Sequence, residues 1–173
     1  NDIMLFNVGE LTRRKNQHVI IEALHQLKDP HIKLFICGRG EPAAALKAMV
    51  NDFGLGDSIH FLGYRRDINE LCCAADIFVF TSLQEGLPRA LMEAMANGKA
   101  VVCSDIRGNT DLINNEKGGF VVPNEPSSIS SAFKTLAAYK SLVGLMGRYN
   151  TVSIRKYRED SSLQATLDLI KSL

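Results

Sequence analysis

The 173-residue sequence predicts an α/β fold: a doubly wound, mostly parallel sheet with a helical C-terminal tail. Three observations predict it. Short, continuous apolar runs alternate with helix-like segments between residues 3 and 122. Most of these runs end at a glycine or a small polar residue, and after Pro123 the pattern becomes purely helical. Continuous apolar strands separated by helices are typical of a parallel sheet that is covered on both faces.

The strands are expected at six apolar runs, which are residues 3–8, 33–37, 58–62, 77–80, 100–103 and 119–122. Helical spacing or helix-start residues place helices between them, at residues 16–28, 42–50, 68–75, 88–97 and 110–114. Asp67 is the expected N-cap of the third of these, and Pro88 and Gly98 should bound the fourth. The tail, about residues 126–173, should hold helices at 127–139, 142–149 and 161–173.

The composition indicates a soluble single domain over residues 1–173. Lys plus Arg is 20 and Asp plus Glu is 19, which gives no indication of a nucleic acid partner. Neither a signal peptide nor a membrane span is visible, so we expect a cytoplasmic protein. The four cysteines form no C-x-x-C pair and the four histidines show no ligand spacing, so neither a disulfide frame nor a metal site is predicted. The chain enters a strand at once and has no initiator Met, which predicts part of a longer protein.

In doubly wound folds, ligands bind at the carboxyl ends of the strands. The loops to consider are therefore residues 9–16, 38–41, 63–67, 81–89 and 104–110. The first of them carries Arg13, Arg14 and Lys15 just before a helix. Cations beside free helix amides suit a phosphate, whereas a solvated basic loop would carry the same residues. Position alone leaves both interpretations open.

A second glycine-rich segment, CGRGEPA at residues 37–43, imitates the G-x-G-x-x-A pattern of nicotinamide-binding domains. The pattern belongs after the first strand of such a fold, and here it follows the second. The favoured interpretation is a tight turn before the helix that Pro42 opens. A nicotinamide-binding domain stays as an alternative.

The segment EGLPRALMEAMANGKAVV, residues 85–102, places Glu85 before a short helix and Glu93 inside it. The outer side of this helix also carries Met92 and Ala96, which predicts a helix buried nearly all round. A buried carboxylate needs donors, and the two vicinal hydroxyls of a ribose would supply them. A plain surface pair of Glu93 with Arg89 is the alternative.

Glu85 should lie in the crevice at the strand ends. Beside it, the amides of Gly86 and Leu87 begin the helix, and Gly86 lets a ligand approach the backbone. Such amides and the helix dipole favour an anion such as a diphosphate.

Together these motifs resemble the C-terminal, nucleotide-sugar-binding half of the family 4 retaining glycosyltransferases of GT-B fold. The resemblance runs in order from residue 8 to about residue 123. Its pieces are VGEL…KN, ICGRGEP, IHFLGYRRDINELCCAADIFVFTS, the E-x7-E segment, SDIRGNTDLI and GGFVVP. The E-x7-E segment followed by a G-x-x-V-V strand is the most specific of them.

The resemblance implies a role for each matched residue. Glu85 would contact hydroxyls of the donor sugar, and Lys15 would bind the diphosphate, so these two form the expected catalytic set. Glu93 would hold the ribose. The residues implied in nucleotide binding are Gly9, Arg13, Arg14, Lys15, Gly63, Tyr64, Arg65, Gly86, Leu87, Ala90 and Glu93.

One residue departs from the family pattern. The family often has Arg directly after the first glycine, as a second diphosphate cation, and this chain has Glu10 there. We expect Arg13 or Arg14 to compensate. A catalytically silent nucleotide-sugar-binding module is the alternative, and Glu10 is the residue that supports it.

The resemblance also implies a reaction and its partners. The donor would be a UDP- or GDP-sugar, transferred with retention to a polysaccharide or glycolipid acceptor, with no metal and no further cofactor. An N-terminal acceptor domain is expected outside this chain, and through it a peripheral membrane contact. The isolated chain is therefore expected to transfer little or no sugar.

Overall fold

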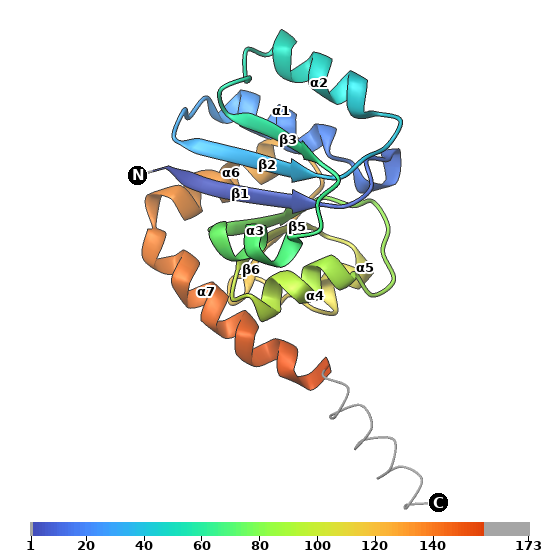
Figure 1. The fold of residues 1–173 in the computed structure, drawn as a ribbon. Helices are drawn as coiled ribbons and strands as arrows, with labels where there is room; N and C mark the ends of the chain where they lie inside the picture. The colour runs from blue at the N-terminus through green and yellow to red at the C-terminus, as the bar shows by residue number, and fades with distance from the viewer. Residues whose placement is uncertain (1, 158–173) are drawn as a thin grey trace, which may run out of the picture.

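The computed structural model describes residues 2–157 and shows a six-stranded parallel sheet in the order β3-β2-β1-β4-β5-β6 (Figure 1). The strands are β1 Ile3–Val8, β2 Ile32–Cys37, β3 Ile59–Gly63, β4 Ile77–Phe80, β5 Ala100–Ser104 and β6 Gly119–Val122. Every predicted strand is present to within a residue at each end. The predicted fold class, a doubly wound parallel sheet with helices at its C-terminal end, is confirmed.

Helices connect the strands and cover both faces of the sheet. They are α1 His18–Leu27, α2 Ala43–Asp52, α3 Ile68–Ala74, α4 Arg89–Ala96, α5 Arg107–Thr110, α6 Pro126–Ala138 and α7 Lys140–Ser153. Two short 3₁₀ helices, η1 Arg13–Lys15 and η2 Ile154–Tyr157, complete the described chain. Figure 1 shows α7 running along the outside of the domain, and its residues contact β5 and α4.

Alternating strand residues build two separate cores. Leu5, Ile77 and Val102 face α1, α2 and α6, together with the apolar side of α7. Their neighbours Phe6, Phe78 and Val101 face α3, α4 and the residues after α5. Both faces of the central strands are therefore buried, which explains why these strands read as continuous apolar runs.

The strand order reverses between β1 and β4, which are hydrogen-bonded neighbours in the middle of the sheet. The chain leaves β1 toward α1 on one face and leaves β4 toward α4 on the other. Loops 9–17 and 81–88 therefore part at this point, and the space between them is where ligands bind in doubly wound folds.

Several local predictions need correction. The short helix predicted at 110–114 lies earlier, at Arg107–Thr110, and the stretch predicted at 142–149 belongs to the longer helix α7. Pro88 is the N-cap of α4 and not its first helical residue. Asp67 stands at the N-cap of α3 but makes no capping hydrogen bond, because its carboxylate pairs with Arg65. The helix predicted at 161–173 lies outside the described residues.

Helix α7 lies unusually close to the turn before β5. A β-carbon added to Gly147 would stand 1.9 Å from the carbonyl oxygen of Gly98. Three residues further on, the buried Asn150 amide donates to the carbonyl oxygens of Lys99 and Gly118, at 2.8 and 2.6 Å. Glycine thus brings the helix near enough for its asparagine to satisfy two backbone acceptors.

Candidate functional site

Three charged side chains meet at the point where the strand order reverses. The Nζ atom of Lys15 lies 2.6 Å from Oε1 of Glu85, and Nη1 of Arg14 lies 3.0 Å from the same oxygen. Arg14 also donates to the carbonyl oxygen of Gln84, at 2.9 Å. The side chains of Lys15 and Glu85 are 16% and 10% exposed, whereas that of Arg14 is 50% exposed. The structure therefore joins residues that lie 70 positions apart in the sequence.

The loop after β1 positions Lys15 through its own turn. Thr12 accepts a hydrogen bond from the backbone N–H of Lys15 and caps η1, and Asn16 takes a left-handed conformation that ends it. The hydroxyl of Thr81, after β4, donates to the carbonyl oxygen of Asn16 at 3.1 Å. The ammonium of Lys15 stands 4.8 Å from the ring centroid of Phe80. Lys15 is thus fixed from both sides of the crevice.

The loop that carries Glu85 rests on a buried polar layer. The Ser104 hydroxyl donates to the carbonyl oxygen of Ser82 at 2.6 Å, and the Asn109 amide donates to the Ser104 carbonyl at 3.0 Å. A β-carbon on Gly108 would stand 2.5 Å from the carbonyl oxygen of Gly86. α5 therefore packs directly under the turn at Glu85 and holds it at the sheet edge.

Glu85 is ionised in this setting. Partial burial raises its pKa, but the hydrogen bond from Lys15 and the charges of Lys15 and Arg14 outweigh that effect, so its pKa lies below the usual value for glutamate. The folded state thus favours the carboxylate more strongly than the unfolded chain does.

The wild type should lose stability relative to Glu85→Gln as the pH falls below about 4.5, the ordinary pKa of glutamate. A carboxyl group with a lowered folded pKa stabilises the fold above its unfolded pKa, and this contribution disappears as the pH falls through the folded pKa. Urea unfolding of both proteins from about pH 7 to about pH 3 measures the difference. All other titratable groups are shared, so a difference that does not change with pH would contradict the assignment.

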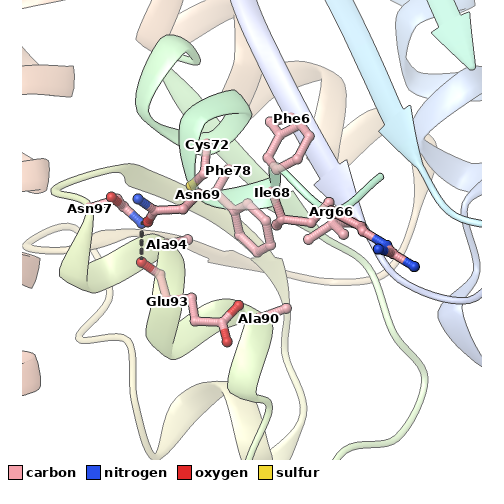
Figure 2. A pocket seen from close by; sticks show the side chains of 11 residues that line it. Phe6, Arg66, Ile68, Asn69, Cys72, Phe78, Ala90, Glu93, Ala94 and Asn97 are labelled. Carbon is pink, nitrogen blue, oxygen red and sulfur yellow. Dashed lines mark hydrogen bonds between the residues drawn. The ribbon is translucent and has the colours of Figure 1, made fainter. Parts of the chain in front are cut away.

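A cavity of about 360 Å³ opens between α3 and α4, the helix that follows the Glu85 loop. Figure 2 shows Ala90 and Glu93 of α4 on one side of it, and Arg66, Ile68 and Asn69 around the start of α3 on the other. Phe6 and Phe78 line it from the sheet. It is therefore an apolar slot with polar groups at its rim.

The predicted burial of Glu93 is wrong. Its side chain is exposed, as is Ala96, and Met92 is half-buried. Within residues 2–157 no hydrogen bond or ion pair reaches its carboxylate, so the alternative pair with Arg89 is absent too. The carboxylate is available at the cavity, but it is not a buried charge that requires hydrogen-bond donors.

A second cavity, of about 460 Å³, lies at the ends of β1, β2 and β3. It shares Val8 and Ile68 with the first, so the two cavities lie side by side. Tyr64, which is 62% exposed, stands at its edge with the guanidinium of Arg39 at 5.6 Å from the ring centroid. The remaining lining residues are Gly9, Glu10, Cys37, Gly38 and Arg65.

The glycines of the C-G-R-G segment serve backbone packing. A β-carbon on Gly38 would stand 1.9 Å from the carbonyl oxygen of Gly9, and one on Gly40 would stand 1.9 Å from that of Leu11. The N–H of Leu11 donates to the carbonyl oxygen of Arg39 at 2.9 Å, which joins the two loops. These contacts account for both glycines without a dinucleotide.

The crevice thus collects most of the predicted site. Lys15, Arg14 and Glu85 form one cluster, while Ala90 and Glu93 line the first cavity. Gly9, Tyr64 and Arg65 line the second cavity, whereas Gly63 is the last residue of β3 and lies just before Tyr64 with a positive φ. Gly86 and Leu87 lie exposed before α4, and their N–H groups donate no hydrogen bond within the described chain. Arg13 is exposed and belongs to neither the cluster nor a cavity.

Sequence reasoning missed four polar residues that line the two cavities: Arg39, Arg66, Asn69 and Asn97. The sequence places Arg39 in a predicted tight turn, although an arginine directly after a strand end is itself a signal of a binding site. Asn97 donates to the carbonyl oxygen of Glu93 at 3.0 Å and to Oδ1 of Asn69 at 2.9 Å, and so links α4 to α3 across the first cavity. No periodicity in the sequence could have indicated that link.

Among residues 2–157, no group of three or more His, Cys, Asp or Glu side chains is placed to hold a metal ion. No helix in that range has both the length and the apolar character needed to cross a membrane.

Of the four cysteines, Cys37, Cys72 and Cys103 are buried and Cys73 is exposed. Burial raises the pKa of Cys37 and of Cys72 to about 11, and it raises the pKa of Cys103 further. All four are free thiols, and Cys73 donates to Oδ1 of Asn97 at 3.0 Å.

Relatives and solved structures resemble the chain over most of its length. It is 35% identical over 127 residues to the UDP-Gal:α-D-GlcNAc-diphosphoundecaprenol α-1,3-galactosyltransferase of Escherichia coli, covering 70% of this chain and 33% of that one. It is 26% identical to the lipopolysaccharide core biosynthesis glycosyltransferase LpsE of Rhizobium meliloti, over 98% of this chain and 50% of that one.

Among solved structures, Anabaena HepE in complex with UDP superposes with a TM-score of 0.90 at 25% identity, over all of this chain and 50% of that one. HepE in complex with UDP-glucose gives 0.88 at 26% identity. The chain spans half or less of the length of each of these proteins. The family model described as glycosyl transferases group 1 matches residues 1–143. The chain therefore belongs to the group 1 glycosyl transferases, and its fold is that of a GT-B C-terminal domain.

Proposed function

We propose that this domain binds the nucleoside diphosphate sugar donor of a retaining glycosyltransferase that builds a polysaccharide or glycolipid. One observation carries the proposal: the Lys15–Glu85–Arg14 cluster stands at the strand-order reversal, next to two adjoining cavities. A nucleotide sugar needs such a succession of sites, with an anion site between a sugar contact and a nucleoside slot.

The diphosphate lies at Lys15 and Arg14 in this proposal, with the N–H groups of Gly86 and Leu87 as further donors. Negative charge grows on the departing diphosphate as the bond to the sugar breaks, and fixed cations and amides stabilise it. Arg14 is the cation that compensates for Glu10, since it reaches the cluster and Arg13 does not. Two cations supply the charge that a divalent metal would supply, so we propose that no metal is required.

The nucleoside occupies the two cavities. The carboxylate of Glu93 accepts hydrogen bonds from the ribose hydroxyls, with Ala90 beneath the sugar ring. The base enters the second cavity past Gly9 and meets Tyr64, with Arg39 stacked over the ring. Gly63 and Arg65 shape the turn that closes this side. Because HepE, a relative over this whole chain, is known in complex with UDP-glucose, we propose a uridine diphosphate sugar before a guanosine one.

The acceptor, in this proposal, binds to a second domain that is not part of these 173 residues, and any membrane contact is made through that domain. The relatives are two to three times as long as the part of them that this chain matches. The isolated chain then binds donor and transfers little or no sugar. Robust transfer by the purified chain, measured with a radiolabelled UDP-sugar, would refute this division of roles.

Glu93→Gln should weaken UDP binding to the chain by about fivefold to tenfold, because an amide offers one acceptor atom where a carboxylate offers two charged ones. Isothermal titration with UDP and with 2′-deoxy-UDP makes the test specific. The wild type should prefer UDP, whereas the variant should bind both with nearly the same affinity.

Glu70→Gln on α3 is the matched control, since Glu70 is exposed and lines neither cavity. It should bind both nucleotides as the wild type does. If Glu93→Gln keeps the full preference for UDP over 2′-deoxy-UDP, the ribose does not lie at Glu93.

A catalytically silent binding module is the second candidate, and Glu10 favours it, because an acid in the family's arginine position lines the second cavity. The two candidates differ in one result. Glu85→Ala in the full-length protein abolishes sugar transfer if the domain is catalytic, and it changes only binding if the domain is silent.

A further inference from the structure

The cations that we assign to the diphosphate already have an anionic partner within the domain. Lys15 and Arg14 both bond Oε1 of Glu85, at 2.6 and 3.0 Å. Within the described chain, Glu85 is the one acid that pairs with Lys15. The side chains of Lys15 and Glu85 are largely withdrawn from water, so their charges are little screened by solvent. The charges of the site therefore compensate one another within the domain.

A bare nucleoside diphosphate would meet this internal anion on arrival. Its terminal phosphate must share Lys15 with the carboxylate of Glu85 or displace it, and the two anions repel each other. Displacement leaves the carboxylate without the hydrogen bonds that it had, at a site where it is only 10% exposed. Binding of the bare diphosphate is thus opposed by Glu85, the residue that pairs with both cations.

A sugar on the diphosphate changes this balance. Sugar hydroxyls are O–H donors, and a carboxylate that accepts from them keeps its hydrogen bonds while Lys15 turns to the phosphate. There is room for the exchange, since apart from its two chain neighbours no residue has an atom within 4 Å of the place where a β-carbon on Gly86 would stand. The sugar donor carries hydroxyl groups at this position, and the bare nucleoside diphosphate that remains after transfer does not.

We propose that Glu85 determines specificity for the intact sugar donor over the bare nucleoside diphosphate, by holding Lys15 and Arg14 until sugar hydroxyls take over its carboxylate. This inference rests on the proposed function and deepens it. In physical terms, diphosphate binding and sugar binding are coupled through one carboxylate. After transfer the hydroxyls leave with the sugar and Glu85 returns to the two cations. Release of the nucleoside diphosphate is thereby favoured.

Titration calorimetry of the 173-residue chain tests the proposal with UDP against UDP-glucose and GDP against GDP-mannose. The wild type should bind the sugar nucleotide more tightly than the bare one. Glu85→Gln should bind the bare diphosphate about threefold to tenfold more tightly than the wild type and should lose the preference for the sugar nucleotide. Glu70→Gln should leave both affinities unchanged.

The outcomes distinguish failure of the proposed nucleotide binding from failure of the proposed role of Glu85. If the folded wild type binds none of the four nucleotides, the proposed function fails and this inference fails with it. If the wild type binds, but Glu85→Gln binds the bare diphosphate no better, the internal anion does not oppose binding and the inference alone is overturned. Should Glu85→Gln not fold, Glu85→Asp replaces it, because aspartate keeps the charge but lengthens the contact with Lys15. It should reduce the preference for the sugar nucleotide over the bare diphosphate, by less than glutamine is expected to.

Discussion

Lys15→Met should weaken the binding of UDP to this chain by about 100-fold, which corresponds to roughly 2.7 kcal/mol. Lys15 stands at the switch point of the sheet with its ammonium 4.8 Å from the Phe80 ring, and it is the less exposed of the two cations. A charge-assisted hydrogen bond from such a position contributes more than one made at an open surface. Methionine keeps the length and the apolar stem, so the fold should be retained. Titration calorimetry measures the loss.

Two comparisons make that result specific. Lys134→Met removes an exposed lysine of α6 that lines neither cavity and pairs with no member of the cluster, so it should leave affinity unchanged. Arg14→Ala should weaken binding less than Lys15→Met, and Arg13→Ala should have the smallest effect, because Arg14 reaches Glu85 and Arg13 is outside the cluster. Binding by folded Lys15→Met within twofold of the wild type would mean that the diphosphate lies elsewhere.

Gly147→Ala should destabilise the fold by about 3 kcal/mol. The added methyl group would overlap the carbonyl oxygen of Gly98, which is backbone and cannot rotate away. Helix α7 must then move outward, and the two hydrogen bonds donated by the buried Asn150 lengthen or break. An unsatisfied carbonyl in that position adds to the cost of the overlap. Urea unfolding followed by circular dichroism gives the difference in unfolding free energy.

The same helix contains its own control. Gly144 is exposed, and the nearest atom to an added β-carbon is Nη1 of Arg148 at 3.5 Å, which is ordinary contact with a flexible side chain. Gly144→Ala should therefore stabilise the fold by about 0.5–1 kcal/mol through helix propensity alone. Equal effects of the two substitutions would show that helix propensity, and not close packing on Gly98, governs both positions.

The sheet was predictable because its strands are buried on both faces. Runs such as residues 77–80 are apolar at every position, and each ends where the chain turns toward a helix. Helix α5 was misplaced because its four residues, RGNT, have no apolar periodicity. Helix α5 is held in place by the hydrogen bond that the buried Asn109 amide donates to the Ser104 carbonyl oxygen. The close approach of Gly108 to the loop at Glu85 holds it as well. Such contacts with distant residues leave no local pattern.

The individual residues of the site were predictable from the sequence, but the contacts between them were not. Strand ends and a helix start identified Lys15 and Glu85, but their contact depends on how loops 9–17 and 81–88 meet in space. The environment of Glu93 was misjudged because Met92 and Ala96 suggested burial. In the structure these two residues line a shallow cavity with Ile154 and Tyr157, which follow some sixty residues later in the chain. The apolar character of a helix face does not distinguish a fully buried face from one that a later segment of the chain covers only in part.

The distribution of the thiols has a practical consequence. Three of the four are enclosed, and burial makes their deprotonation harder, so they are poor nucleophiles in the folded chain. A maleimide or iodoacetamide dye would consequently attach at Cys73, beside Asn97 at the rim of the slot between α3 and α4. These 173 residues thus supply a single labelling position next to the Glu93 cavity, from which fluorescence can report nucleotide binding without an engineered cysteine.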